Sequence, residues 1–352
     1  MKKIGIVFGT FAPLHRGHID IIQTAKKKYD KVFVVASGYK DDRGDKIGLD
    51  LKKRFRYIRE VFSGDELVDI FELDETDIDR YPNGWDSWLE RLKTVVGWNS
   101  YSDTNDFYFV VSEEEYSDEL TSRGYNVDFG ERVLGISGTK IRENPDKYWR
   151  YISSSFRRHF TKKVLVIGSA SNGKTTLAID LGRYFDAPVN LEYSREYQTK
   201  YNVKDDEIDA KDFYYLLLGQ LQGAGDLIDS RENRGLVIAD TNSTVTKAYY
   251  DFYLKGKDPG QDKVFDGLFS SINQKEEWDL ILFITPTGKY VDDGYRDQSM
   301  ADDDSRKNFS EYLDSLRKIY HQDTNVVYLD GNYEENYKKA KAAIDQVYNF
   351  DL

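Results

Sequence analysis

Two glycine-rich stretches, far apart in the chain, contain residue types that bind phosphate. The first joins Gly9, Thr10 and Phe11 to His15 and His18, directly after a short apolar run. The two imidazoles lie one helical turn apart, so they share one side of a helix start. Backbone N–H groups and the dipole of such a helix attract anions, and imidazole donors add to that attraction. The stretch predicts a site for the triphosphate of ATP rather than a histidine pair that merely caps a helix.

A hydroxyl-rich segment of the same half supports this interpretation. Ser137 and Thr139 stand at an expected helix start, and Lys140 and Arg142 follow them. Hydroxyls of this kind cap a helix or donate to phosphate, and the two cations can neutralise a leaving pyrophosphate. Alone, the segment would be an ordinary capped surface helix. Together with the histidine stretch it predicts the far side of one nucleotide site.

The second glycine-rich stretch, 168–175, matches the P-loop pattern G-x-x-x-x-G-K-[ST] between an apolar run and a helical one. We expect Lys174 to reach the β- and γ-phosphates of ATP and Thr175 to bind Mg²⁺. Asp240 ends a later apolar run, where an acid can contact a metal-bound water or the substrate. The other residues predicted to bind ATP in this half are Gly168, Ser171, Asn172, Gly173, Thr176 and Arg296.

Apolar runs and amphipathic stretches alternate through both halves, which predicts parallel sheets covered by helices on both faces. The fold class expected is α/β, with two doubly wound domains, 1–155 and 156–352. The expected strands are 4–8, 31–37, 68–72, 107–112, 163–167, 189–193, 235–239, 280–284 and 325–329. The expected helices are 17–28, 49–62, 85–96, 114–123, 173–184, 210–232 and 334–348.

The composition limits the class of protein. A chain of 352 residues is long enough for two domains. The net charge of −12 argues against nucleic acid as the main partner. No apolar run approaches a membrane span, and no basic-then-apolar leader opens the chain, so we expect no membrane insertion. Zero cysteines exclude disulfides and thiolate metal sites, which suits a cytoplasmic protein. The sequence leaves the oligomeric state open, a homo-oligomer included.

The stretches 9–18 and 136–142 resemble those of nucleotidyltransferases, and the fuller pattern is similar to the NadR family. Further support comes from 81–85, 111–116 and 141–145, and the likeness spans nearly the whole chain. The resemblance implies a Rossmann-like nicotinamide-nucleotide adenylyltransferase domain followed by a P-loop ribosylnicotinamide kinase domain. ATP would be the co-substrate of both and Mg²⁺ their cofactor. Since the chain begins at the first strand, we expect it to lack the helix-turn-helix repressor module of some relatives.

The resemblance also implies roles for single residues. Gly9, Thr10, Phe11, His15 and His18 would bind ATP, with Ser137, Thr139 and Arg142 opposite. Asn83 and Trp85 would face nicotinamide mononucleotide, the indole stacking on the cationic ring. In the second domain Glu192, Tyr193, Arg195 and Asp240 would bind ribosylnicotinamide. Asp240 and Glu192 remain alternative bases for its hydroxyl.

The segment from Asp293 through Arg296 to Arg306 is expected to form a lid, with a plain acidic loop as the alternative. The position after the first glycines of the P-loop is Ala170, where relatives often have an acid, so nucleoside selectivity stays open.

Other enzyme classes fit less well. A flavin-pathway kinase would lack the P-loop, and a tRNA synthetase would need a second signature loop. A dehydrogenase would need G-x-G-x-x-G after its first strand. A sensor with vestigial catalysis remains an alternative. The sequence also leaves open the preference for the amidated over the deamidated mononucleotide.

Overall fold

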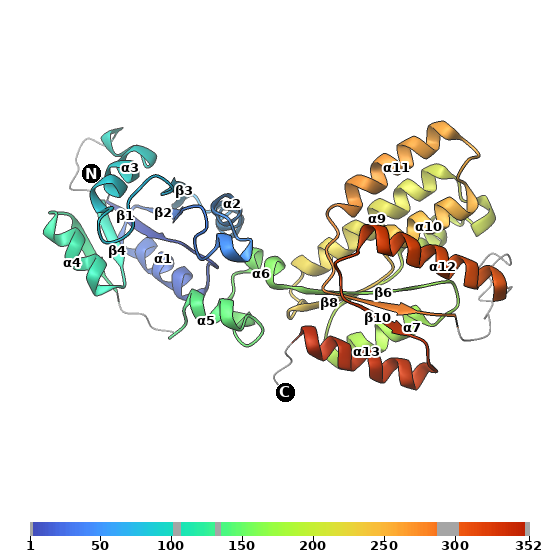
Figure 1. The fold of residues 1–352 in the computed structure, drawn as a ribbon. Helices are drawn as coiled ribbons and strands as arrows, with labels where there is room; N and C mark the ends of the chain where they lie inside the picture. Colours follow the sequence, from blue (N-terminus) through green and yellow to red (C-terminus); the bar gives the residue numbers. More distant parts are fainter. Residues whose placement is uncertain (1–2, 101–106, 131–134, 287–302, 349–352) are drawn as a thin grey trace. The chain divides into compact units, whose positions relative to one another are not determined.

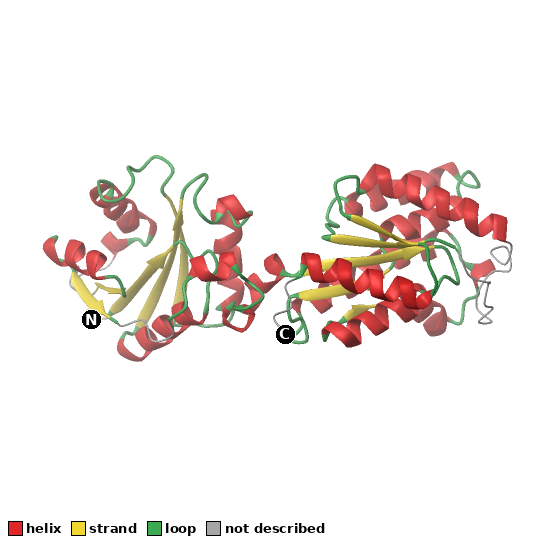
Figure 2. Ribbon diagram, turned by 60° about the horizontal axis from the view of Figure 1, so that its bottom comes forward, coloured by secondary structure: helices red, strands yellow, loops and turns green. Residues whose placement is uncertain are grey.

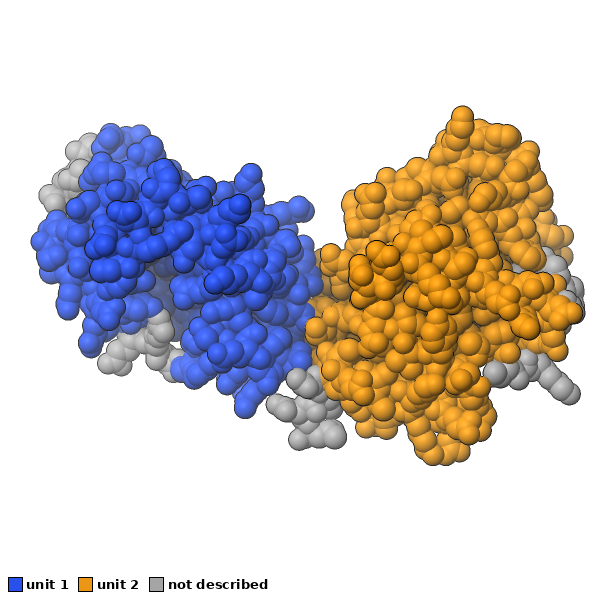
Figure 3. Space-filling view, viewed as in Figure 1, with its two compact units in different colours: residues 1–160 blue, residues 161–352 orange. Residues whose placement is uncertain are grey.

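The chain folds into two compact units, residues 1–160 and 161–352, coloured separately in Figure 3. The computed structural model describes residues 3–100, 107–130, 135–286 and 303–348 (Figure 1). The boundary expected between residues 155 and 156 falls inside helix α6 (Ser154–Phe160). This helix packs its Phe156 into the core of the first unit, so the boundary follows it.

In the described part of the first unit, five parallel strands form one sheet in the order β3-β2-β1-β4-β5. The strands are β1 (Ile4–Gly9), β2 (Lys31–Gly38), β3 (Val68–Asp74), β4 (Phe107–Val111) and β5 (Asn126–Phe129). The α-helices are α1 (Arg16–Lys28), α2 (Leu51–Val61), α3 (Trp85–Val95), α4 (Glu114–Ser122), α5 (Gly138–Glu143) and α6. The 3₁₀ turns are η1 (Asp45–Ile47), η2 (Trp98–Ser100) and η4 (Trp149–Tyr151).

Alternating residues of the central strands face opposite layers of helices. Val7 packs with Ile22 of α1 and Ile58 of α2, whereas Ile6 packs with Leu89 of α3 and Leu120 of α4. Because the apolar side chains of a strand point alternately to the two faces, both faces must be covered, as Figure 2 shows. The strand order reverses at β1. In such sheets a crevice opens at the carboxyl ends of the strands on either side of that reversal.

The second unit repeats the plan with another strand order, β10-β9-β6-β8-β7, again all parallel in the described residues. The strands are β6 (Lys162–Gly168), β7 (Val189–Asn190), β8 (Leu236–Asp240), β9 (Leu280–Ile284) and β10 (Val326–Leu329). The helices are α7 (Lys174–Phe185), α8 (Tyr193–Tyr201), η5 (Asp205–Glu207), α9 (Ala210–Asp229), α10 (Ser243–Tyr253), α11 (Pro259–Asn273), α12 (Asp303–Tyr320) and α13 (Tyr333–Val347).

The core of this unit is again divided by its sheet. Val164 and Val166 of β6 pack toward α7 and α13, and Leu165 and Ile167 pack toward α10 and α12. Helices α8, α9, α10 and α11 pack together around a third apolar cluster that includes Phe213, Tyr250 and Phe265. Figure 1 shows α7 and α13 on one side of the sheet and α9 to α12 on the other. No helix in the described part of the chain has the length and apolar character needed to span a bilayer.

The predicted fold class is confirmed: both units are α/β with helices on both faces of a parallel sheet. The strand expected over 189–193 was too long, because β7 ends at Asn190 and helix α8 begins at Tyr193. Helices α8, α10, α11 and α12 were missed, as was the edge strand β5. The remaining predicted elements agree with the structure to within a few residues at their ends.

Candidate active sites

The first unit contains a cavity of about 710 Å³ at the carboxyl ends of β1, β2 and β4. Its lining includes a cationic group and an aromatic group, together with the acidic residues Asp20, Asp42, Glu75, Asp79 and Glu113. The cationic group comes from the loop after β1, from the loop after β2 and from the start of α5. It includes Gly9, Thr10, Phe11, His15, His18, Arg43, Ser137, Thr139 and Arg142. The structure thus brings together all the residues predicted to bind ATP in this half.

The two histidines are held in one orientation by the start of α1. His15 is the N-cap residue, and its backbone N–H donates to Nδ1 of His18 over 3.3 Å. The rings stack with their centroids 3.7 Å apart, and Phe11 meets the His18 ring edge-on. Since Nδ1 of His18 accepts a hydrogen bond, the ring proton lies on Nε2. His18 therefore offers an N–H donor at a helix N-terminus, where an anion is favoured.

Two arginines complete the cationic group. Arg142 donates to the Ala12 carbonyl over 2.7 Å and to the Thr139 hydroxyl over 3.0 Å. Arg43 donates to the Thr10 hydroxyl over 2.8 Å. Burial lowers the pKa of Arg142, and the positive charge of Arg43 lowers it further. Two cations that repel each other across a cavity favour an anion between them.

A buried ion pair supports the loop that carries Arg43. The Arg54 guanidinium donates to both carboxylate oxygens of Asp42, over 2.8 and 2.7 Å. Asp42 also accepts the N–H groups of Gly44 and Asp45. Burial alone would raise the pKa of Asp42, but the hydrogen bonds from Arg54 and the backbone lower it overall. This pair was not found from the sequence, because no motif joins an acid in a loop to an arginine in the next helix.

The aromatic group forms another part of the cavity lining. Trp85 packs edge-on against Trp88 and Tyr116, and all three line the cavity. Trp85 is also part of the apolar core, and this packing does not prevent it from lining the cavity. Asn83 is exposed and does not line the cavity, contrary to its predicted contact with the mononucleotide. Lys140 does not line it either, since its ammonium group donates to the Gly135 carbonyl.

In the second unit the P-loop lies between β6 and α7, as expected. Gly168 has φ +155°, and a Cβ there would lie 2.5 Å from the Ile284 carbonyl oxygen, so only glycine fits. The Lys174 ammonium donates to the Ser169 carbonyl over 3.0 Å. Asn172 donates to the Ser169 hydroxyl over 2.8 Å. These bonds fold the loop around its own backbone, as an anion-binding nest requires.

Other P-loop residues differ in how they contribute. Ser171 and Gly173 have φ values of 59° and 77°, which give the loop its turn. Gly173 is the N-cap residue of α7, so the first N–H groups of that helix follow it directly. Thr176 is exposed on α7. Arg296, predicted to bind ATP here, lies outside the described residues. Arg306, expected in the same lid, is instead buried in α12 and pairs with Asp303.

Asp240 and Thr175 meet beside the P-loop. The Thr175 hydroxyl donates to Oδ2 of Asp240 over 2.5 Å. Oδ1 of Asp240 is buried and has no hydrogen-bond partner in the described parts of the chain. Burial raises the pKa of Asp240 to about 6 and Glu192 adds to the rise, although Lys174 and the Thr175 hydrogen bond oppose it. A buried carboxylate oxygen without a partner needs a cation or a donor from a ligand.

A cavity of about 400 Å³ adjoins this carboxylate. Glu192, Arg195 and Lys174 line it, together with the aromatic rings of Tyr249 and Tyr253. The predicted acceptor residues Glu192 and Arg195 are thus placed in one pocket. Tyr193 is not among the lining residues, because its ring packs against the backbone at Gly219.

Gln220 connects the start of α8 to the end of β8, and its role was not predicted from the sequence. Its side-chain oxygen accepts the backbone N–H of Tyr193 over 2.8 Å. Its side-chain nitrogen donates to the carbonyls of Asp240 and Thr241, over 3.3 and 3.2 Å. One buried amide thus links the start of α8, which carries Arg195, to the end of β8.

Comparisons with known proteins agree with this division. The family model described as cytidylyltransferase-like matches residues 6–144. The model described as an AAA domain matches residues 163–336. Each match contains one of the two phosphate-binding loops, so the two loops belong to two different domain families.

Similarity to NadR proteins extends over nearly the whole chain. The chain is 28% identical over 330 residues to the trifunctional NAD biosynthesis/regulator protein NadR of Salmonella typhimurium, covering 90% of this chain and 77% of that protein. It superposes on a crystal structure of NadR protein in complex with NR with a TM-score of 0.88 and 37% identity, covering 100% of this chain and 97% of the other. A NadR complex with NAD and AMP-PNP gives a TM-score of 0.86 and 38% identity, covering 100% and 98%. The chain belongs to the NadR family.

Proposed function

We propose that this chain makes NAD in two ATP-dependent steps, one in each unit. Residues 161–352 phosphorylate ribosylnicotinamide, and residues 1–160 transfer the adenylyl group of ATP to the resulting mononucleotide, releasing pyrophosphate. The observation that carries the proposal is that each unit joins its own phosphate-binding loop to its own cavity. The similar NadR structures contain NR in one case and NAD with AMP-PNP in the other, which are ligands of this scheme.

Adenylyl transfer needs no protein base, since the phosphate of the mononucleotide is already ionised. That phosphate attacks the α-phosphorus of ATP, and the bond to pyrophosphate breaks. The negative charge that develops is met by the Nε2 proton of His18, by the start of α1, and by Arg142 and Arg43. Catalysis then consists of positioning and charge stabilisation, as in other phosphoryl transfers.

The kinase site has the donor set expected for Mg²⁺. The described residues contain no group of three His, Cys, Asp or Glu suited to hold a metal ion. Mg²⁺ in ATP sites, however, is held by one or two protein oxygens together with phosphates and water. The Thr175 hydroxyl and the buried, unpartnered Oδ1 of Asp240 fit that pattern. An ion held by these two oxygens would neutralise part of the negative charge of the ATP phosphates.

Phosphoryl transfer itself depends on residues of the P-loop and the adjoining cavity. Lys174 holds the phosphates from the P-loop, and the acceptor hydroxyl attacks the γ-phosphorus while ADP leaves. The hydroxyl proton needs a carboxylate, and Glu192 lines the cavity whereas Asp240 is committed to Thr175. We therefore assign Glu192 as the base and Asp240 to the metal.

The test is a pair of variants in the full chain, assayed with each substrate in turn. His18→Ala is expected to abolish dinucleotide formation from the mononucleotide and to leave phosphorylation of ribosylnicotinamide at its normal rate. Lys174→Ala is expected to do the reverse. Either variant having normal turnover in the reaction assigned to it would contradict the assignment, and absence of both products from the unmodified chain would favour a sensor.

A further inference from the structure

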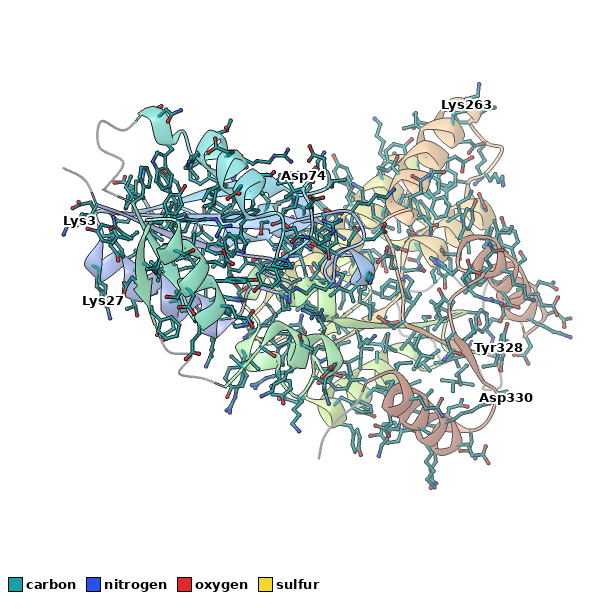
Figure 4. The ribbon with its side chains drawn as sticks, turned by 60° about the vertical axis from the view of Figure 1, so that its left-hand side comes forward. Lys3, Lys27, Asp74, Lys263, Tyr328 and Asp330 are labelled. Carbon is teal, nitrogen blue, oxygen red and sulfur yellow. The ribbon has the colours of Figure 1, made fainter. Side chains whose placement is uncertain are left out.

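Glu75 is an acidic side chain in the wall of the first cavity that the proposed reaction does not use. It follows Asp74, the last residue of β3, which is labelled in Figure 4. Its carboxylate oxygen Oε1 accepts the indole N–H of Trp88 over 3.0 Å. Trp88 in turn packs edge-on against Trp85. Glu75 is therefore fixed beside the aromatic group of the cavity lining.

The surroundings of Glu75 act on its ionisation in opposite directions. Burial raises the pKa of Glu75 overall, although hydrogen bonds from Ser37 and Trp88 oppose the rise. Among the nearby charged groups, Asp42 raises this pKa and Arg80 lowers it. Hydrogen bonds donated to a carboxylate favour its ionised form, so the indole and the hydroxyl hold an acceptor there.

The aromatic rings near Glu75 suit a flat cation. Trp85, Trp88 and Tyr116 contact one another or share Phe8 as a neighbour, with ring centroids 4.8 to 5.8 Å apart. Such rings attract a cationic ring through their faces. The phosphate of the same ligand would meet the arginines and histidines of the cationic group.

We propose that Glu75 makes the first site select the amide form of the mononucleotide over the acid form. This inference rests on the proposed function, since it assumes that the nicotinamide ring enters the aromatic group. Both forms carry a positive ring, which the carboxylate attracts. The amide adds N–H donors that a carboxylate can accept, whereas the acid adds a second negative charge that it repels. Selection then comes from repulsion of the wrong ligand as well as attraction of the right one.

The experiment measures kcat/KM for nicotinamide mononucleotide and for nicotinate mononucleotide in the full-length chain. Glu75→Gln keeps the size of the side chain and removes its charge, and the ratio of the two kcat/KM values is expected to fall about tenfold toward the acid. Glu75→Asp keeps the charge and is expected to keep the preference. Glu72→Gln is the matched control, because Glu72 lies in β3, close to Glu75 in the chain, and does not line the cavity.

Circular dichroism and urea denaturation report whether the first unit of each variant is folded, because phosphorylation of ribosylnicotinamide is assigned to the other unit with its separate core. If Glu75→Gln turns over too slowly to assay, the two mononucleotides are compared by calorimetric titration, with the same shift expected in their Kd ratio. A ratio that stays unchanged in Glu75→Gln, including equal losses with both mononucleotides, overturns the proposal. If the unmodified chain used neither mononucleotide, the proposed function would fail instead, so the two failures are distinguishable.

Discussion

Arg54 has no exposed surface, and it lies beneath the loop that presents Arg43 to the first cavity. The guanidinium leaves no room for side chains on the backbone around it. A Cβ at Gly38 or at Gly44 would overlap its nitrogen atoms. The four residues thus depend on one another, because the two glycines make room for the Arg54 guanidinium, which in turn pairs with Asp42. Its effect on function is indirect, since it fixes the backbone from which Arg43 reaches Thr10.

Removing the guanidinium is expected to be costly. Arg54→Met leaves Asp42 as a buried carboxylate without its partner and should lower the free energy of unfolding of the first unit by about 3–5 kcal/mol. Arg56→Met is the control on the same helix, because that side chain is 78% exposed and pairs with Glu60 at the surface. It should change stability by less than about 0.5 kcal/mol. Urea denaturation of both variants checks the difference, and similar losses would contradict the role given to Arg54.

At this scale the sequence predicted residues that belong to a motif and missed those that depend on tertiary contacts. The histidine stretch and the P-loop identify themselves by spacing, so His18 and Lys174 were found. Glu75 left only a weak signal, since it is one more acid directly after a strand that already contains three. Gln220 left none, since a glutamine within an amphipathic helix is ordinary until its partners on β8 and α8 are known.

Helix α9 holds the kinase site together at the scale of elements. Through Gln220 it ties the start of α8 to the end of β8, where Thr241 has the left-handed φ of 85°. A β-branched residue rarely adopts that conformation, so the surrounding structure must stabilise it. The amide of Gln220 does so by binding the Thr241 carbonyl. Gln220 therefore helps to set the distance between the Asp240 carboxylate and the pocket lined by Glu192 and Arg195.

Gln220→Leu should disturb that spacing without touching a substrate phosphate. We expect kcat for ribosylnicotinamide phosphorylation to fall by about tenfold or more and the KM of the nucleoside to rise, with the KM of ATP nearly unchanged. Gln222→Leu is the control, since Gln222 is an exposed residue of the same helix whose side chain donates to Asp226. Steady-state kinetics with each substrate varied in turn makes the measurement. Equal changes in both KM values would indicate general loosening instead.

Helices α10, α11 and α12 meet around a buried polar cluster that predicts a pH dependence. Nε2 of His321 faces the Thr244 hydroxyl at 2.9 Å and the amide nitrogens of Asn242 and Asn273 at 3.3 Å, so it acts as an acceptor. Burial, together with the positive charge of Arg317, lowers the pKa of His321 to about 4. The unfolded chain binds this proton near pH 6.5 and the folded chain only near 4.

Because the unfolded state binds the proton first, stability from His321 is complete above pH 6.5 and is lost as pH falls toward 4. His321→Gln keeps an acceptor without a titrating group and should flatten this part of the curve. Urea midpoints of the unmodified chain and the variant between pH 4 and 7 give the comparison. Parallel curves for the two proteins would rule out His321 as the source of the slope.

The elements that the sequence missed share a physical cause. Helix α10 is rich in β-branched and aromatic residues, which have low helix propensity, and most of its residues are buried, so it has no polar stripe. Strand β7 stops early because Glu192 already caps α8. Helix α11 did carry a signal, since Asp258 caps it ahead of Pro259 at its first position. The central strands were predicted correctly, because each is an apolar run bounded by glycine or by charged residues.

For the whole molecule, the important feature is that two complete sites lie on two units with separate cores. A chain with one site inactivated should still supply the other reaction. We expect His18→Ala protein alone to stop at the mononucleotide, and Lys174→Ala protein alone to make nothing from ribosylnicotinamide. An equimolar mixture of the two should make NAD, because the mononucleotide can pass through solution. Chromatography of the products checks this, and a mixture that accumulates only mononucleotide would show that the intermediate must stay within one chain.

The residues that we assign to phosphate binding lie at the carboxyl ends of the strands in each sheet, so the amino ends of the described strands lie away from the proposed chemistry. In the first unit, the turns at Gly64 and Gly124 precede β3 and β5, and a Cβ at either glycine would meet no atom within 4 Å. Because Gly64 and Gly124 have φ values of +78° and +81°, both are best kept as glycine, and a short tag inserted beside them would lie a strand length from the proposed chemistry. The protein therefore offers positions for surface immobilisation or optical reporting at which both catalytic steps should continue undisturbed.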